Sequence, residues 1–473
     1  MVYINRNSKE PLYMQIYQQI KKEILDGSRK EGEVLEGTRG LAKTLNVSRN
    51  TVDCAYSQLL AEGYIASKKG IGYYVMKVPR IKVSDRNVSN NFSIIKKHSD
   101  NVPQHKVIYD LTNSSYTSDL FPKRLWRKYT LECLDRLDNE ARISSYQDKQ
   151  GELYLRSNLL SYLKRIRGVR CDERQIIITC GIQQSLEYIC KMLHCKEATI
   201  LMEEPGFDKA VSVFMNNGIR IQTVPVDKKG IVVSELPLID NVSAIYSTPS
   251  HQFPTGATLS IDRRYELLKW VKERNVYIIE DDFDSELRYY HKPIPSLQSI
   301  DSDNRVIYLG TFSKTLSPSI RMGYMILPPQ LLEIYDNIFN TYNSTVPLLN
   351  QYVIGRLIET GHYERHIRRL NNVFRKRLEL FLAEFSEVKD KINISSNGSG
   401  QYFLLKFSEK VKQDELIERA LEHGVRVYST MRFWQDKAAC PPNTLFLGFS
   451  KIKLEDIPDC VTRLKKAWAE WLY

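Results

Sequence analysis

The opening of the chain carries apolar residues at helical spacing. Between Leu12 and Ile24 an apolar residue recurs at every fourth position, while Lys and Glu fill the opposite face. Pro11 precedes this run and Gly27 follows it, and these two residue types favour the start and the end of a helix. The pattern predicts an amphipathic helix that packs one face against a small core.

Two shorter helical patterns follow, separated by a brief break. The segment TRGLAKTLNV places Leu41 and Leu45 on one face, and NVSRNTVDCAYSQLLAEG begins with Ser48, whose hydroxyl suits an N-cap. Although a three-helix unit could also bind protein, this spacing favours a helix-turn-helix, whose second helix reads the major groove of DNA. The residues at the start of that helix, which are candidates for DNA contacts, are Arg49, Asn50 and Thr51.

A hairpin pattern comes next, in the segment YIASKKGIGYYV. It predicts two short strands around a tip that contains Lys68, Lys69, Gly70 and Gly72. A hairpin beside a helix-turn-helix forms a wing, and its lysines are further candidates for phosphate contacts. Residues 1–76 are therefore predicted to form an α+β winged helix-turn-helix.

The periodicity is then lost and resumes in a different form. Residues 77–108 are rich in Asn, Ser, Lys and Asp, which predicts a flexible tether for most of this stretch. Residues 109–473 alternate apolar, β-rich runs with helical patterns such as RRYELLKWVKERN. This alternation predicts an α/β domain with a mostly parallel central sheet and a ligand at the carboxyl ends of its strands. The runs expected to be strands are IIIT, ATILM, IRIQTVPV, SAIYST, VYIIE, RVIYLG and MGYMIL.

Composition narrows the class of protein. A chain of 473 residues is too long for one core, and its 42% apolar content excludes wholesale disorder. No apolar run approaches a membrane span, and the start carries no apolar targeting segment, so we expect a soluble protein without a membrane partner. The eight cysteines form no CxxC pair, which argues against zinc and disulfides and favours the cytoplasm; no metal site is expected.

The positive charge of the chain is concentrated near its start. Of the net charge of +12, residues 1–108 carry +8, from 18 Lys and Arg against 10 Asp and Glu. A solvated surface would explain such an excess equally well on its own. Beside a predicted helix-turn-helix, it favours a polyanionic partner such as DNA.

Three of the predicted strands are followed by residues that could bind a ligand. Asp281 follows VYIIE, Lys314 follows RVIYLG, and Gly181 precedes a predicted helix whose free N–H groups could hold a phosphate. A lysine for a Schiff base, a carboxylate for a pyridinium nitrogen and an anion site for a phosphate together describe a pyridoxal 5′-phosphate site. A solvated acidic loop, an ordinary helix start and a surface lysine are the alternatives.

The sequence motifs of both parts resemble those of one family of regulators. TRGLAKTLNVSRNTVDCAYSQLLAEGYI is similar to the GntR family of winged-helix regulators, with Arg39 and Arg49 retained, although Glu36 and Gly37 stand where that family usually has a Pro-Ser pair. The motifs EEPGF, STPSHQFPTG, IIEDDFDSELRY and GTFSKTLSPSIRMGY resemble, in this order, the fold-type I aminotransferase domain of the MocR/GabR subgroup. The resemblance implies a GntR head, with Arg39 as a further DNA contact, fused to a domain that binds pyridoxal phosphate.

The resemblance implies a role for individual residues of that domain. Lys314 matches the lysine that forms the internal aldimine, and Asp281 matches the partner of the pyridinium nitrogen. The residues that match phosphate contacts are Ser313, Arg321 and the backbone N–H groups near Ile182 and Gln183. In YSTMRFW, Arg432 matches the arginine that grips an effector carboxylate, although a structural ion pair is an equal alternative, and Lys209 stands in for a second arginine.

Two departures from the subgroup bear on chemistry. Phe283 and Phe207 stand where the subgroup usually has tyrosine beside the cofactor. Loss of the hydroxyl at 283 removes a hydrogen-bond donor to the cofactor's phenolate oxygen, which should make the imine a stronger base. Both changes argue against efficient catalysis.

Four functions remain open on this evidence. The favoured one is a regulator that binds operator DNA and senses an amine or amino acid through an external aldimine. The others are a regulator for which pyridoxal phosphate itself is the signal, an active aminotransferase with a DNA-binding head, and a scaffold with a vestigial pocket. The resemblance also implies a homodimer that the segment around Tyr146 completes, with each head lying over the partner's large domain.

Overall fold

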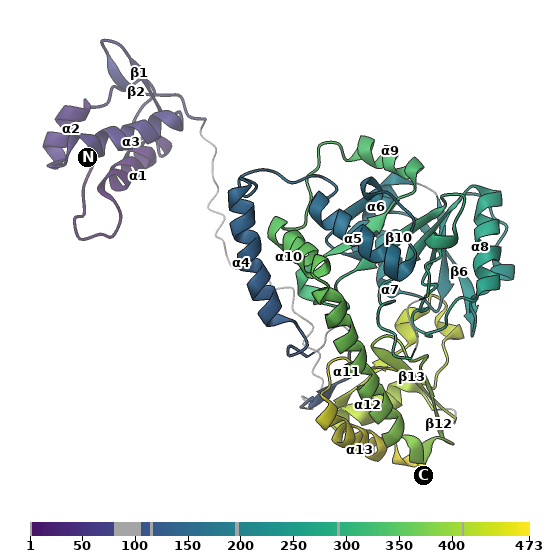
Figure 1. Ribbon diagram of the computed structural model, residues 1–473. Helices are drawn as coiled ribbons and strands as arrows, with labels where there is room; N and C mark the ends of the chain where they lie inside the picture. Colours follow the sequence, from purple (N-terminus) through teal and green to yellow (C-terminus); the bar gives the residue numbers. More distant parts are fainter. Residues whose placement is uncertain (1, 80–105, 114–116, 194–197, 291–293, 409–410) are drawn as a thin grey trace. The chain divides into compact units, whose positions relative to one another are not determined.

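The computed structural model describes residues 2–79, 106–113, 117–193, 198–290, 294–408 and 411–473. The chain divides into two compact units, Met1–Val102 and Pro103–Tyr473 (Figure 1). Most of the predicted tether lies outside the described residues. Residues 106–108, at its end, are described. The backbone N–H of Ile108 donates to the carbonyl of Gly424, so this end of the predicted tether belongs to the second unit. In the described part of the chain, no helix combines the length and the apolar character needed to cross a bilayer.

The first unit is a winged helix-turn-helix, as the sequence predicts. Its elements are α1 (Leu12–Leu25), α2 (Thr38–Leu45), α3 (Arg49–Ala61), β1 (Ile65–Lys68) and β2 (Gly72–Val75). Ile16, Ile20 and Ile24 of α1 are buried in its core, whereas Leu12 and Leu45 are only half-buried. Ser48 caps α3 by accepting a hydrogen bond from the N–H of Thr51, which confirms the predicted start of this helix.

The second unit is built on an eight-stranded sheet. The strand order is β4-β11-β10-β9-β8-β5-β6-β7, and the five strands from β10 to β6 run parallel. Residues 312–322, which contain no crossover α-helix, connect β10 to β11, and β11 returns antiparallel beside β10. The bounds are β4 (Ile176–Thr179), β5 (Thr199–Glu204), β6 (Arg220–Asp227), β7 (Gly230–Ile231), β8 (Val242–Ser247), β9 (Tyr277–Asp281), β10 (Val306–Thr311) and β11 (Gly323–Ile326).

Both faces of this sheet are covered by helices. Along β4, Ile177 packs in one cluster with residues of α6 (Ile182–Met192), α7 (Asp208–Asn216) and α9 (Pro329–Ile338). Ile176 and Ile178 point to the other face, against α4 (Lys123–Asn139), α5 (Leu153–Arg167) and α10 (Leu348–Glu359). Farther along that sheet, α8 (Ile261–Arg274) packs on Leu201 and Ile245. A sheet buried on both faces explains why its strands read as continuous apolar runs.

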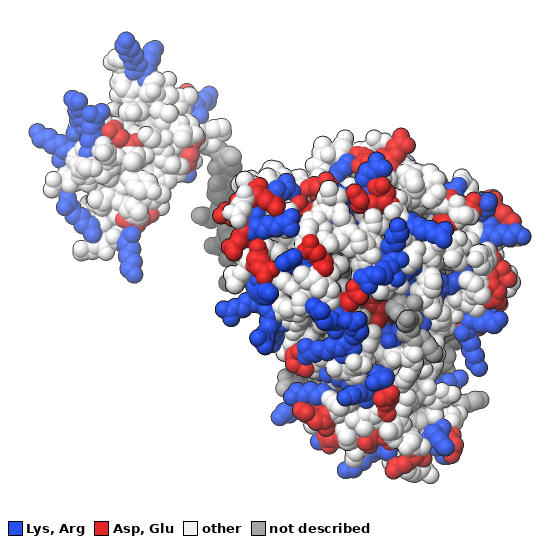
Figure 2. All heavy atoms as spheres, viewed as in Figure 1, with Lys and Arg blue, Asp and Glu red and all other residues white. Residues whose placement is uncertain are grey.

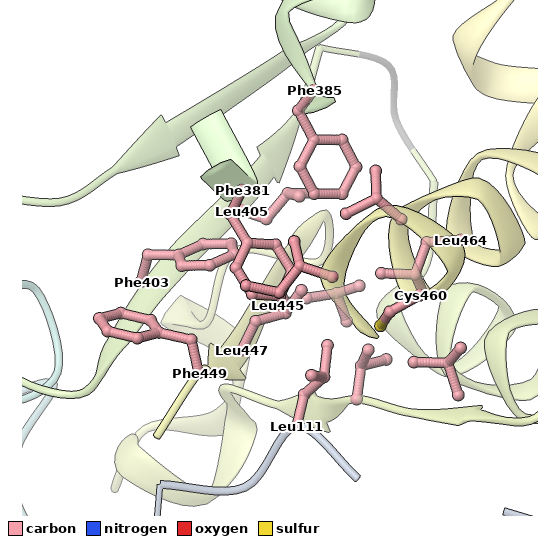
Figure 3. Close-up of a cluster of buried hydrophobic side chains, with 14 of the residues drawn as sticks. Leu111, Phe381, Phe385, Phe403, Leu405, Leu445, Leu447, Phe449, Cys460 and Leu464 are labelled. Carbon is pink, nitrogen blue, oxygen red and sulfur yellow. The ribbon is translucent and has the colours of Figure 1, made fainter. Parts of the chain in front are cut away.

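The end of the chain forms a smaller layer. An antiparallel sheet has the order β12-β13-β16-β15, formed by β12 (Ile392–Ser395), β13 (Tyr402–Phe407), β15 (Tyr428–Ser429) and β16 (Thr444–Gly448). The helices beside it are α11 (His362–Glu384), α12 (Gln413–Glu422), α13 (Ile457–Ala467) and α14 (Ala469–Leu472). Figure 3 shows their apolar side chains pointing toward one another, with Leu111 among them. Leu111 comes from the start of the unit, where β3 (Tyr109–Asp110) pairs in parallel with β14 (Val425–Arg426).

Candidate functional site

Three strand ends meet at one edge of the large sheet. Leu309 of β10 lies beside Asp281 of β9, and Thr311 lies beside Gly323 of β11, which lies beside Thr179 of β4. The chain leaves β10 toward Lys314, and it leaves β4 toward Gly181 and α6. The topology thus gathers the three features that the sequence only places at separate strand ends.

A cavity of about 430 Å³ lies at this edge. Every residue that we predict to hold the cofactor or the effector lines it. These residues are Ile182, Gln183, Phe207, Lys209, Asp281, Phe283, Ser313, Lys314, Arg321 and Arg432.

Asp281 presents an unsatisfied carboxylate oxygen within this buried site. The side chain is 2% exposed, and its Oδ2 accepts a hydrogen bond of 2.5 Å from the hydroxyl of Tyr246. Oδ1 has no hydrogen-bond partner among the described residues. Burial, and next the charges of other carboxylates, raise the pKa of Asp281 to about 7 despite the bond from Tyr246. A buried acceptor that lacks a partner fits a ligand that brings a donor, such as a protonated pyridine nitrogen.

Lys314 is held in position by a distant part of the chain. Its Nζ donates to the carbonyl of Asn113, 3.2 Å away. Burial lowers the pKa of Lys314 to about 8, and the charge of Lys209 acts in the same direction, whereas Asp284 and Asp281 raise it. An amine with a lowered pKa is more often unprotonated at neutral pH, which is the form that attacks a carbonyl.

An anion site lies at the start of α6. Gly181 precedes the helix with φ of +121°, and a Cβ built on it would lie 3.4 Å from a guanidinium nitrogen of Arg321. The guanidinium therefore lies beside the free N–H groups of Ile182 and Gln183, and no acidic residue occupies the first turn of α6. A helix N-terminus together with an arginine is a site for a phosphate.

Aromatic side chains form one wall of the cavity. Phe253 contacts Phe207, Phe283 and Phe433, with ring centroids 5.6, 5.9 and 4.9 Å apart. Phe207 and Phe283 are both half-buried and line the cavity. This wall offers contact to an apolar surface, and without tyrosines at 207 and 283 it has no hydroxyl at these two positions.

Two cations, Arg432 and Lys209, also line the cavity. Arg432 is exposed, and its guanidinium lies 4.7 Å from the ring centroid of Phe433 and 5.6 Å from that of Tyr428. Among the described residues, no carboxylate lies within ion-pair distance of Arg432 or of Lys209, so the structure does not support the alternative of a structural ion pair for Arg432.

A buried ion pair fixes the strand end that carries Asp281. Arg167 binds the neighbouring Asp282 with two bonds of 2.8 and 2.9 Å, and both side chains are at most 1% exposed. Asp282 also accepts from Tyr308, at 2.5 Å, and from Ser285, at 2.7 Å. Because Arg167, Tyr308 and Ser285 all bind the carboxylate of Asp282, we assign Asp282 to fixing this strand end and not to binding a ligand.

The candidate DNA contacts lie on exposed parts of the head. Arg39, Arg49, Asn50, Lys68 and Lys69 are exposed. Arg49 lies 3.3 Å from Asp53, one turn along α3, which leaves it on the surface at the start of that helix. Lys and Arg side chains outnumber acidic ones on the visible face of the head (Figure 2).

The structure gives side-chain contacts for two further residues of the head. The hydroxyl of Thr51 lies 2.8 Å from that of Ser48, so it takes part in the cap of α3. Glu36 accepts a hydrogen bond from Thr44, which turns its carboxylate onto α2.

Sequence reasoning missed several residues near these sites. Arg6 donates to the carbonyl of Asn46, in the turn between α2 and α3, and so adds a cation to the head. Asn113 and Tyr428 line the cavity. Asn113 lies outside any motif and 201 positions from Lys314, so no local signal could have revealed it. Tyr428 opens the segment YSTMRFW, in which only Arg432 was given a role.

Comparison with known proteins agrees with this architecture. Residues 110–434 match the family described as aminotransferase class I and II, and residues 12–75 match the family of bacterial regulatory proteins named gntR. The chain is 37% identical over 470 residues to the uncharacterised HTH-type transcriptional regulator YhdI of Bacillus subtilis, covering 99% of this chain and 98% of that one. It is 30% identical over 477 residues to the probable rhizopine catabolism regulatory protein MocR of Rhizobium meliloti, covering 99% and 96%.

A solved structure agrees as well. The kynurenine aminotransferase of Pyrococcus horikoshii, in complex with PMP, is similar with a TM-score of 0.70 at 26% identity, over 78% of this chain and 92% of that one. The aminotransferase family depends on pyridoxal 5′-phosphate, which confirms the cofactor predicted from the sequence. The chain thus belongs to the GntR family of transcription regulators, in the MocR-type subgroup that joins a winged helix-turn-helix to an aminotransferase class I and II domain.

Proposed function

We propose that this protein binds operator DNA through its winged helix and senses an amine or amino acid in the cavity around Lys314. In this proposal residues 1–76 read DNA, residues 77–108 connect the units, and residues 109–473 bind cofactor and effector. The observation that carries it is the pairing, within one cavity, of a lysine whose pKa is lowered with an arginine that has no carboxylate partner in the described structure.

The residues of the cavity divide between cofactor and effector. When bound, pyridoxal phosphate supplies an aldehyde that condenses with the amine of Lys314 and can exchange it for the amine of an effector. Asp281 accepts from the ring nitrogen, while Ser313, Arg321 and the start of α6 hold the phosphate. Arg432, with Lys209 beside the cavity, remains available for the acid group of the effector.

The aromatic wall supports sensing over turnover. Turnover requires Lys314 to move a proton at the effector's Cα and the cofactor ring to be held by well-placed donors. Phe207 and Phe283 supply no such donor from the wall. We therefore expect covalent exchange of an amine with little or no keto-acid product.

A homodimer is part of this proposal. Five large apolar side chains between residues 131 and 153 are exposed, and Tyr146 among them is 87% exposed. A concentration of exposed apolar side chains marks a protein interface. In this proposal each head lies over the partner's large domain, and residues 77–108 join the two units of one chain.

The experiment is a screen of amines and amino acids against the purified protein. Visible absorbance of the bound cofactor reports exchange at Lys314, a keto-acid assay reports turnover, and fluorescence anisotropy reports operator binding. We expect an effector to change the spectrum and the affinity for operator DNA, and DNA to change the affinity for effector by the same factor. Multiple turnovers to a keto acid would make the protein an enzyme. Spectral silence toward every amine, with DNA binding that depends on the cofactor, would make the cofactor itself the signal.

A further inference from the structure

A buried histidine and aspartate form a pair behind the aromatic wall. His251 follows β8 and Asp284 follows β9, and Nδ1 of the histidine lies 2.8 Å from Oδ2 of the aspartate. Their side chains are 4% and 3% exposed. The cofactor and effector roles assigned above use neither residue.

The fold makes room for this pair. A Cβ on Gly400 would lie 2.4 Å from Cε1 of His251 and 2.9 Å from Oδ2 of Asp284, and a Cβ on Gly256 would lie 3.3 Å from Nε2 of His251. Both glycines have positive φ, of +74° and +78°. A side chain at Gly400 could not fit without moving the pair, so the loop is shaped around it.

The histidine ring is fixed in its plane. It is nearly parallel to the ring of Phe283, at 22° with centroids 6.2 Å apart, and to the ring of Tyr402, at 25° and 5.5 Å. Contacts with these two rings restrict rotation of the imidazole and keep Nδ1 aimed at Asp284. A hydrogen bond donated to a carboxylate favours its ionised form.

The pair lies close to Lys314. Nε2 of Gln401 donates to the carbonyl of Lys314, at 3.1 Å, and the adjacent Gly400 is the residue that packs against Asp284. Phe283, which precedes Asp284, lines the cavity. Of the charges that act on the amine of Lys314, that of Asp284 has the largest effect and raises its pKa.

We propose that His251 and Asp284 are positioning residues that fix a negative charge beside the nitrogen of Lys314 and stabilise its protonated form. His251 holds the carboxylate in place, and Asp284 provides the charge. The inference rests on the proposed function only in taking Lys314 as the reactive amine. When the nitrogen of Lys314 is protonated, the cofactor carbon bound to it is a better electrophile for an incoming amine. The pair would therefore tune how readily an effector amine replaces Lys314 on the cofactor.

Other charged groups also face these residues and must be kept constant. Lys209 and Asp281 act on Lys314, and Asp281 titrates near neutral pH. The groups around Asp284 are Arg288, Tyr289, Tyr402, Asp281 and Lys314, and burial raises the pKa of both tyrosines well above the range tested. Asp284→Asn also removes a charge that raises the pKa of Asp281, whereas the His251 variants keep that carboxylate, so the two sets of variants are compared.

The test measures protonation at Lys314 by two methods in the full chain. In protein freed of cofactor, the rate of modification by an amine-specific reagent is followed against pH by peptide mass. In protein loaded with cofactor, visible absorbance is titrated over the same range. Asp284→Asn should lower both midpoints by about one to two pH units, as loss of a nearby opposite charge does.

The histidine is tested with a matched pair of variants. His251→Phe keeps a stacked ring but has no donor, and should lower both midpoints by less than Asp284→Asn does. His251→Asn restores a donor near the position of Nδ1 and should return them toward those of the parent. Asp262→Asn, which removes an exposed carboxylate that pairs with Lys229, should leave both unchanged.

The proposal is overturned if Asp284→Asn is folded, as judged by circular dichroism, and both of its pH midpoints equal those of the parent. If that variant does not fold, equal midpoints for His251→Phe and His251→Asn would overturn it instead. Modification of cofactor-free protein needs neither effector nor DNA, so a failed effector screen leaves this result independent.

Discussion

Asp281→Asn tests the assignment of Asp281 through stability rather than chemistry. Asp281 is buried, and its pKa in the folded protein is raised from 3.8 to about 7. The folded state therefore holds this proton more tightly than the unfolded state, and its stability falls as the pH rises from about 4 to about 7. Above that range the ionised carboxylate destabilises the cofactor-free fold.

The magnitude follows from the size of this shift. A shift of about three pKa units corresponds to at most about 4 kcal/mol, and relaxation with water entry into the cavity reduces this to about 2 kcal/mol. Asparagine can still accept the hydrogen bond from Tyr246 and has no charge. Cofactor-free Asp281→Asn should therefore be more stable than the parent at pH 8, by about 2–3 °C in melting temperature for a unit of this size, and equal to it at pH 4.

The assay is thermal unfolding at pH 4 and pH 8, with and without pyridoxal phosphate. The parent should gain stability from the cofactor, because a protonated ring nitrogen pairs with Asp281, and the variant should gain much less. Asp240→Asn serves as the control, since that aspartate is exposed and lies outside the cavity. Equal melting temperatures at pH 8 without cofactor, or an equal gain from cofactor in parent and variant, would refute the reasoning.

Three further predictions concern the other assigned residues. Lys314→Ala should abolish the cofactor label that survives borohydride reduction, whereas Lys269→Ala, at an exposed position, should keep it; a label mapped to another lysine would contradict the assignment. Arg49→Ala should weaken operator binding and reduce the salt dependence of log affinity by about 0.9, measured by anisotropy from low to moderate salt, with Arg174→Ala as an exposed control that should change neither. Arg432→Gln should weaken binding of a carboxylate-bearing amine by about 10- to 150-fold, which is the loss of about 1.5–3 kcal/mol, and should leave binding of the matching decarboxylated amine unchanged; equal losses for both would remove Arg432 from the effector site.

Much of the fold can be predicted from local sequence patterns. Period-four apolar spacing in α1, an N-cap at Ser48 and apolar runs for the strands each depend on residues near in sequence, and the structure confirms these elements. The antiparallel direction of β11 was not predicted, because an apolar run on its own does not specify the direction of a strand. The chain that joins β10 to β11 contains no crossover α-helix, and β11 returns antiparallel beside β10.

The cavity around Lys314 combines local and distant contributions. The sequence could place Asp281 and Lys314 at one edge of the sheet because each follows a recognisable apolar run. Their actual partners, Tyr246 for Asp281 and Asn113 for Lys314, lie 35 and 201 positions away in the sequence. Contacts over such separations follow from tertiary packing, and one sequence contains no local signal for them.

The basicity of Lys314 shows why residue identity alone does not determine the chemistry. From the sequence, loss of the tyrosine hydroxyl at Phe283 predicts a more basic imine. In the structure, burial acts in the opposite direction on the amine, and the charge of Asp284 partly offsets it. The residue after Phe283 in the chain thus supplies an electrostatic effect in the direction that the phenylalanine alone predicts. Because these effects oppose one another, the protonation state at neutral pH depends on the position of the Asp284 carboxylate, which the proposal assigns to His251, and on whether an effector neutralises Lys209.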